Sequence, residues 1–197
     1  MEAREERIGE VIEASTGIYS AQSYQLYELP ALGEMIKCRQ GETEIMAVTC
    51  NGSTTSLEPG RRPIARGLEE SSEEELYRNN PQLNQLLRSE FDAVVVGYKQ
   101  GDAYHQYLPP RPVRLHSFVY RCSTEEIVEF SQSLEFLVLL AGAQCEVPVE
   151  ELVSACLRIL GGYHGEEADF NTRAGRKLAE MYSGDYQRLR AILARLK

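Results

Sequence analysis

The sequence predicts an α+β fold, with a small antiparallel β-barrel of about six strands followed by a C-terminal region of about four helices. In the first 60 residues, short apolar segments alternate with turn signals at a spacing of about ten residues, which is typical of barrels and sandwiches rather than of β/α units, and strand patterns return from residue 91. From residue 123 onward, apolar residues recur at helical spacing. We therefore expect a barrel over residues 1–120 and a helical region over 121–197, although strand spacing alone does not separate a barrel from a sandwich.

Four strands are expected within the first 50 residues. Residues 8–14 (IGEVIEA) alternate apolar and polar side chains, which is the period of a half-buried strand. Residues 20–29, 33–39 and 44–50 are the next three candidates, and the turn signal Asn51-Gly52-Ser53 is expected to close the fourth.

A helical insertion is expected near residues 71–89, between two strands of the barrel. Ser71 can act as an N-cap with Glu74 three residues later, a capping box, and acidic residues favour the positive end of a helix. Before this helix we expect a loop over residues 59–63 and a short strand over 64–68. The helix is expected to be interrupted at 79–81 and to be followed by a second helical segment with Leu83, Leu86 and Leu87 on one face.

Strands return with residues 91–98, because three consecutive valines favour a strand. A turn over 99–102 leads to a hairpin partner over 103–108. The segment 109–112 (PPRP) is expected to be an extended exit, since proline supplies no backbone donor. Residues 113–122 are the last expected extended segment.

Four helices are expected after residue 122, packed on the barrel because about 70 helical residues alone make a marginal core. They are a helix capped at Ser123 and running through Leu140, one opened by Pro148 and ended by Gly161-Gly162, one capped by Asn171 and ending near 183–184, and one over 185–197.

The charge of the chain is unevenly distributed. The formal net charge is −9, which argues against nucleic-acid binding by the whole surface. Residues 172–197, however, hold seven basic and two acidic side chains, a net +5, which leaves −14 for the rest. This basic tail is expected either to contact phosphates or to pack against the acidic body; few aromatic residues accompany it, which favours the second interpretation.

The composition predicts a cytoplasmic protein without a membrane segment. No apolar run approaches the roughly 20 residues that span a bilayer, and the N-terminal residues are charged. The five cysteines show no Cys-x-x-Cys spacing, so they are expected to be buried, reduced thiols. We expect no metal and no cofactor.

No catalytic constellation stands out. The chain contains no Gly-x-x-x-x-Gly-Lys-Ser/Thr phosphate loop. The stretch 161–167 (GGYHGEE) could ligate a metal, but a helix end followed by a loop is the simpler interpretation. His105 could act as a general base, but an exposed or cross-strand histidine is the simpler interpretation. His116 beside Ser117 does not form a nucleophile–base pair, because adjacent strand residues face opposite sides. We expect a protein that is not an enzyme.

The β half resembles the HAS barrel, the six-stranded N-terminal barrel of HerA-type DNA translocases and rotary ATP synthases. The residues that carry the resemblance are 8–16 (IGEVIEAST), 47–49 (AVT), 91–98 (FDAVVVGY) and 108–112 (LPPRP), within about residues 6–120. In that family the barrel mediates assembly, and a similar leucine- and proline-containing segment leads to the ATPase. Here helices replace the ATPase, so no catalytic residue is carried over.

These observations predict a non-catalytic adaptor that binds a protein partner, with an accessory factor in DNA processing, beside a translocase or nuclease, as the alternative. The residues expected to contact the partner are Leu108, Pro109, Pro110 and Arg111 at the barrel exit and Arg188, Leu189 and Leu193 in the last helix.

Overall fold

Six antiparallel strands close into a barrel, and a seventh extends it as a hairpin. The computed structural model describes residues 6–58, 60, 62–165 and 168–196. Within this part of the chain the strands are β1 (Arg7–Ala14), β2 (Ile18–Ser23), β3 (Met35–Gln40), β4 (Thr43–Ser56), β5 (Leu87–Gln100), β6 (Ala103–His105) and β7 (Phe118–Arg121). The order is β2-β1-β7-β3-β4-β5, and β2 pairs back onto β5 to close the barrel, whereas β6 pairs with β5 alone. The predicted barrel is confirmed.

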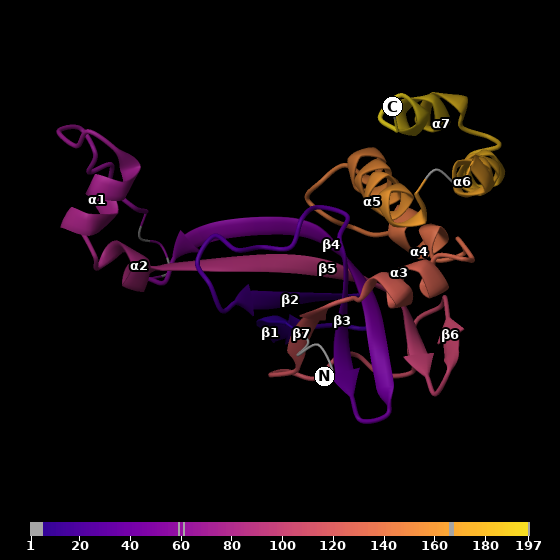
Figure 1. Ribbon diagram of the computed structural model, residues 1–197, viewed down its shortest axis with the longest axis horizontal. Coiled ribbons are helices and arrows are strands. Elements are labelled where there is room, and N and C mark those ends of the chain that lie inside the picture. The colour runs from indigo at the N-terminus through magenta and orange to yellow at the C-terminus, as the bar shows by residue number, and fades with distance from the viewer. Residues whose placement is uncertain (1–5, 59, 61, 166–167, 197) are drawn as a thin grey trace.

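Helices follow the barrel, so the α+β class is confirmed as well (Figure 1). The described part of the chain has five helices after the barrel, one more than expected: α3 (Thr124–Phe130), α4 (Leu137–Ala141), α5 (Val149–His164), α6 (Ala168–Met181) and α7 (Tyr186–Leu193). Two short helices, α1 (Glu73–Asn79) and α2 (Leu83–Leu86), lie in the excursion between β4 and β5.

The barrel has its own apolar interior. Alternate residues of each strand face inward, as the two-residue period requires. On β5 these are Phe91, Ala93 and Val95, all at most 1% exposed. Tyr19 of β2 and Ile36 of β3 reach the same interior.

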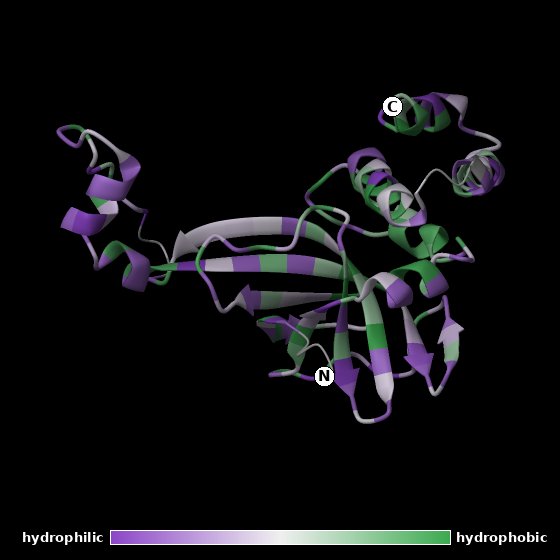
Figure 2. Cartoon of the chain, in the orientation of Figure 1, coloured by the Kyte–Doolittle hydropathy of each residue, from purple (hydrophilic) through white to green (hydrophobic). Residues whose placement is uncertain are grey.

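A second core lies between the barrel and the helices. Val94 and Val96 of β5 face outward and belong to one apolar cluster with residues of α3, α4 and α5, of which α4 contacts β5. Phe130 of α3 and Leu137 of α4 complete the contact. Figure 2 shows the apolar colour concentrated where these helices meet the barrel. The valine run is therefore buried on both faces, and the expected packing of the helices on the barrel is confirmed.

Two glycines permit this close packing. Gly33 adopts φ +85°, and a Cβ added there would lie 2.4 Å from the backbone nitrogen of Cys156 in α5. At Gly97 of β5 a Cβ would meet the carbonyl oxygen of His105 at 2.3 Å and the ring of Phe130 at 3.1 Å. A side chain at either position would push a helix or the β6 hairpin away from the barrel.

The prediction of a strand over residues 20–29 is too long. β2 ends at Ser23, whose hydroxyl oxygen lies 2.9 Å from the Gln25 carbonyl oxygen and 2.8 Å from that of Glu28. These contacts favour a compact loop over an extended chain, and Tyr27 within it adopts φ 69°. The last extended segment is also shorter than expected, since β7 begins only at Phe118.

The predicted turn at residues 51–53 is wrong. Asn51, Gly52 and Ser53 continue β4 and pair with Asp92, Phe91 and Glu90 of β5. An irregularity between Thr49 and Asn51 changes the register there. The segment 64–68, expected to be a strand, has no strand partner. The N-cap of α1 is Ser72, one residue later than expected.

The single helix expected from Ser123 to Leu140 is divided into α3 and α4. The capping box at Ser123 and Glu126 is present. Gln106, which follows β6, then substitutes for helical hydrogen bonds at the break: its Nε2 donates to the carbonyls of Phe130 (2.5 Å) and Ser133 (2.9 Å). Its Oε1 accepts from the backbone of Phe136 at 2.9 Å. The barrel hairpin thus stabilises the interruption.

The glycine pair at residues 161–162 does not end its helix. α5 continues to His164 and gives way at Gly165, which adopts φ 63°. α6 begins at Ala168, so Asn171 lies inside this helix and does not cap it. Asp185 caps α7 by accepting from the backbone of Arg188 at 3.0 Å.

Candidate functional site

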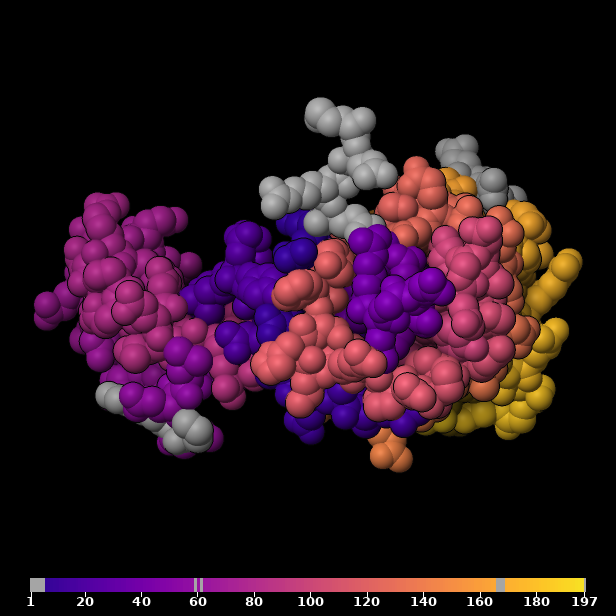
Figure 3. All heavy atoms as spheres, turned by 90° about the horizontal axis from the view of Figure 1, so that it is seen from below, coloured from indigo at the N-terminus to yellow at the C-terminus, as the bar shows by residue number. Residues whose placement is uncertain are grey.

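The excursion between β4 and β5 forms an arm that projects from the barrel. We define the arm as residues 57–86 together with the ends of β4 and β5 that support them. Figure 1 shows β4 and β5 extending past β2 toward α2 and α1, and Figure 3 shows the arm as a separate lobe. Neither α1 nor α2 contains a buried residue. The arm therefore has little core of its own.

The arm contacts the loop between β2 and β3. The hydroxyl oxygens of Tyr27, in the β2–β3 loop, and Tyr77, in α1, lie 2.5 Å apart, with the rings edge to face at 6.3 Å. This hydrogen bond raises the pKa of Tyr27 to about 12. Leu29 packs against Gly52, where a Cβ would lie 3.1 Å from the leucine side chain. These contacts connect the arm and the β4 strand that supports it to the β2–β3 loop.

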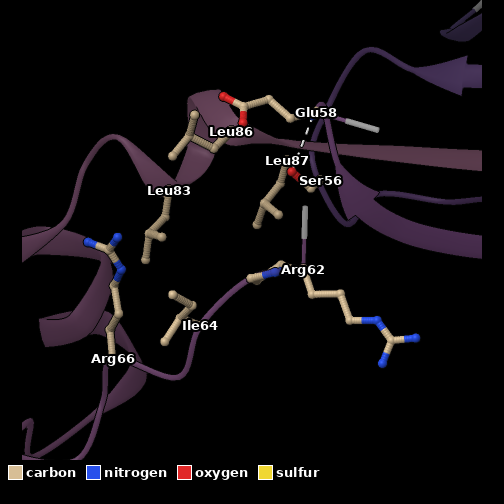
Figure 4. Close-up of a pocket in the computed structure, with 9 residues that line it drawn as sticks. Ser56, Glu58, Arg62, Ile64, Arg66, Leu83, Leu86 and Leu87 are labelled. Atoms are coloured by element: carbon tan, nitrogen blue, oxygen red, sulfur yellow. Dashed lines mark hydrogen bonds between the residues drawn. The ribbon is translucent and has the colours of Figure 1, made fainter. Parts of the chain in front are cut away.

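A small apolar pocket opens within the arm (Figure 4). Its volume is about 70 Å³. Ile64, Leu83, Leu86 and Leu87 supply aliphatic surface. The remaining lining residues are Ser56, Glu58, Arg62, Pro63 and Arg66. In Figure 4 the aliphatic side chains gather in the centre and the two arginines flank them on opposite sides.

A second apolar groove lies at the helical end, between α5, α6 and α7. Its volume is about 510 Å³, and its apolar lining includes Leu157, Phe170, Leu193 and Leu196. Leu193, expected to contact a partner, is 42% exposed here. Arg158 lies at the edge and donates to the carbonyl of Arg195 at 2.7 Å. The groove is thus apolar with a basic edge.

Leu189 and Arg188 are the other residues of the last helix that were expected to contact a partner. Both already contact other parts of the protein. Leu189 is partly buried against the second core. Arg188 forms an ion pair with Glu150 of α5 at 2.7 Å. Both residues attach α7 to the rest of the protein, whereas Leu193 faces the groove.

Three basic residues of the tail form ion pairs with glutamates that precede the tail in the chain. Besides the pair formed by Arg188, Arg195 lies 2.5 Å from Glu151 and Lys177 lies 2.5 Å from Glu135. Much of its positive charge is therefore compensated within the molecule.

The barrel exit at residues 108–111 is only partly exposed. Pro109 is buried, and Leu108 is 37% exposed. Leu108 lines a cavity of about 390 Å³ together with Ile18 and Leu139, where the barrel meets α4. Pro110 and Arg111 are exposed. The structure does not bring this segment together with the residues of α7.

One serine–histidine pair lies within hydrogen-bond distance, and the sequence analysis did not identify it. Ser131 Oγ lies 2.7 Å from His164 Nε2, and the imidazole stacks on Phe170 with centroids 4.4 Å apart. The Ser131 hydroxyl also donates to the Ile127 carbonyl at 2.6 Å. Ser131 is also fully buried, and the pair joins the C-terminal end of α3 to α5.

The other histidines have structural neighbours. His105 packs against Tyr98, and its Nδ1 lies 3.1 Å from the Tyr107 hydroxyl, as a cross-strand histidine would. His116 lies 2.6 Å from Glu10, and this hydrogen bond is the main cause that lowers the pKa of the Glu10 carboxyl. Among the described residues, no group of three or more His, Cys, Asp or Glu side chains could hold a metal ion. Part of the stretch 161–167 lies outside these residues.

The cysteines include three that are buried, Cys38, Cys50 and Cys156, and all five are free thiols. Burial raises the pKa of Cys38 and of Cys156 to about 12. Across the described segments, no helix is both long and apolar enough to cross a membrane.

Sequence reasoning predicted the excursion but did not identify the arm as a surface. The available signals were its aliphatic residues Ile64 and Leu68, which are 76% and 98% exposed in the fold. A pattern of residues shows that they are apolar, but not that they face water. No protein-family model matches this chain, and no curated protein matches it in sequence.

Proposed function

We propose that this chain is a non-catalytic adaptor whose helical end binds an amphipathic helix of a protein partner. The observation that carries the proposal is the groove between α5, α6 and α7, because Leu193 is 42% exposed above an apolar lining. Grooves of this kind accept the apolar face of a helix.

The charges at the groove indicate the chemistry of the partner. Arg158 lies at its edge, and Arg190 lies one helical turn before Leu193. Arg190 forms no ion pair with any other residue that the structure describes. A partner helix with acidic residues beside its apolar face would complement these arginines.

The barrel serves as the scaffold in this proposal. A closed barrel of six strands is compatible with the HAS-barrel resemblance, since that family's barrel also has six strands. The alternative is an accessory factor in DNA processing that uses the basic tail. Ion pairs of Lys177, Arg188 and Arg195 with glutamates favour the adaptor, because these cations are already compensated.

The test compares the proteins that the full chain and two variants of it retain from native cell extract. Leu193→Glu changes the groove, and Tyr186→Glu is the matched control, since Tyr186 is on the same helix, is 75% exposed and does not line the groove. We expect a protein retained by the wild type and by Tyr186→Glu to be lost with Leu193→Glu, and a synthetic acidic amphipathic helix from that protein to bind the purified chain. Equal capture of the protein by all three chains, or failure of the synthetic helix to bind, would refute the proposal that the groove is the binding site.

The alternative predicts a different result. Recovery of nucleic acid that falls steeply as salt rises, and that persists in Leu193→Glu, would support the DNA-processing role. Urea denaturation of both variants shows whether each is folded before its capture is compared.

A further inference from the structure

The arm lacks the interior that would normally stabilise such an excursion. α1 has seven residues and α2 has four, and isolated helices of this length are not stable in water. Leu68 is 98% exposed and Ile64 is 76% exposed. Aliphatic side chains gathered on one projecting element are typical of a protein–protein contact.

The pocket in the arm is suited to an amino-acid side chain. Its volume of about 70 Å³ is far below the roughly 300–1,000 Å³ of pockets that hold small molecules. Arg62 and Arg66 flank its aliphatic centre (Figure 4), and within the described residues neither arginine takes part in an ion pair. The complementary ligand is an aliphatic side chain next to a carboxylate.

The same arm carries a segment with that chemistry. Leu68 is directly followed by Glu69 and Glu70. Glu69 is exposed and, within the part of the chain that the structure describes, forms no ion pair, whereas Glu70 accepts from Asn79 Nδ2 at 2.9 Å. Leu68 does not line the pocket of its own arm and faces water instead. One molecule therefore has both the pocket and an aliphatic side chain next to a carboxylate, but this side chain does not enter its own pocket.

We propose that two copies of this chain associate through their arms, with Leu68 of each copy in the pocket of the other. Glu69 of each copy then pairs with Arg62 or Arg66 of the other. A two-fold axis forms every contact twice, which is the usual geometry of homodimers. The arm projects clear of the barrel, so two arms can meet without contact between the barrels (Figure 3). This self-association goes beyond the adaptor function, because it uses the arm and leaves the helical groove free.

The first test measures the mass of the full chain by sedimentation equilibrium over a range of protein concentrations. We expect a wild-type dimer, and Leu68→Glu should raise the dimer dissociation constant by about tenfold or more. The matched control is Leu115→Glu, because Leu115 is 57% exposed but lies outside the arm. A wild-type chain that stays monomeric at every concentration, or a Leu68→Glu variant that dimerises like the control, would overturn the proposal.

The second test exchanges the charges. Arg62→Glu with Arg66→Glu in one chain, and Glu69→Arg in a second chain, should each weaken self-association because like charges then meet. Mixed in equal amounts, the two chains should form a heterodimer, since both pocket contacts again join opposite charges. Failure of the mixture to associate, with both chains folded by circular dichroism, would refute the pairing. Loss of partner capture by Leu193→Glu bears only on the groove, so the two proposals fail independently.

Discussion

Lys37 of β3 and Glu126 of α3 join the barrel to the first C-terminal helix through an ion pair. The Lys37 side chain is fully buried, and that of Glu126 is 17% exposed. Glu44 of β4 lies 3.3 Å from the same ammonium. Glu126 also accepts from the backbone of Ser123 at 2.8 Å, which completes the capping box of α3. One carboxylate thus caps a helix and compensates a buried charge.

Replacing Glu126 by alanine should lower the free energy of unfolding by about 2–4 kcal/mol. The change removes a partner from a buried lysine and half of a capping box. Urea denaturation measures the difference. Glu125→Ala is the control, because Glu125 is exposed in the same helical turn, and it should change stability by less than about 1 kcal/mol. Equal effects of the two substitutions would mean that the ion pair contributes nothing.

Gly33→Ala should destabilise the protein by about 3 kcal/mol or more. The alanine would hold a left-handed conformation and would also place its Cβ against the backbone of Cys156. Gly41→Ala separates the two causes, because Gly41 has φ +66° and open space around it. That control should lose only about 1–2 kcal/mol in the same urea experiment. A loss at Gly33 no larger than at Gly41 would show that α5 does not approach the loop so closely.

Gly162→Ala should stabilise the protein by about 0.5–1 kcal/mol. Gly162 lies inside α5, is exposed, and has nothing within 4 Å of an added Cβ. Alanine therefore gains helix propensity without a clash. Thermal unfolding measures the gain. A neutral or destabilising result would place the end of the helix at the glycine pair, as the sequence pattern suggested.

The Glu10 carboxyl should titrate below its ordinary value of 4.5, because the hydrogen bonds from His116 and Tyr24 favour the carboxylate. A lowered pKa in the folded state contributes stability above the ordinary value, and this contribution is lost as the pH falls through the folded pKa. Carboxyl-detected NMR titration measures the shift. In His116→Ala the pKa of Glu10 should move back toward 4.5, whereas in His105→Ala it should stay low. An unchanged pKa in His116→Ala would exclude this hydrogen bond as the cause.

Local patterns predicted the barrel well where the pattern itself decides the structure. The alternation over residues 8–14 corresponds to β1, and the valine run lies in β5, buried on both faces. The pattern failed where a distant partner decides. Asn51-Gly52 favours a turn by itself, but pairing with β5, some 40 residues away in sequence, keeps it extended. The break between α3 and α4 likewise depends on Gln106, a barrel residue.

The candidate surfaces were harder to predict than the fold. Leu193 was identified from helical periodicity, but its neighbour Leu189 shares that periodicity and packs against the core. Periodicity identifies the apolar face of a helix but not the residues on that face that a neighbouring helix leaves uncovered. For the arm, the pocket depends on Ile64 and Leu83 coming together from two segments, which no local pattern encodes.

The outward-facing valines of β5, Val94 and Val96, also determine whether the chain can be cut into two fragments that fold separately. The last strand of the barrel ends at residue 121 and helices follow it. We nevertheless expect the barrel and the helices to fold as one unit, because they share a core. A fragment ending at residue 120 would expose Met46, Val48, Val94 and Val96 to water, and a fragment of the helices alone would lose the surface beneath Phe130. The barrel and the helices should therefore unfold in one thermal transition. A chimeric protein that includes this barrel should also need the helices in order to fold.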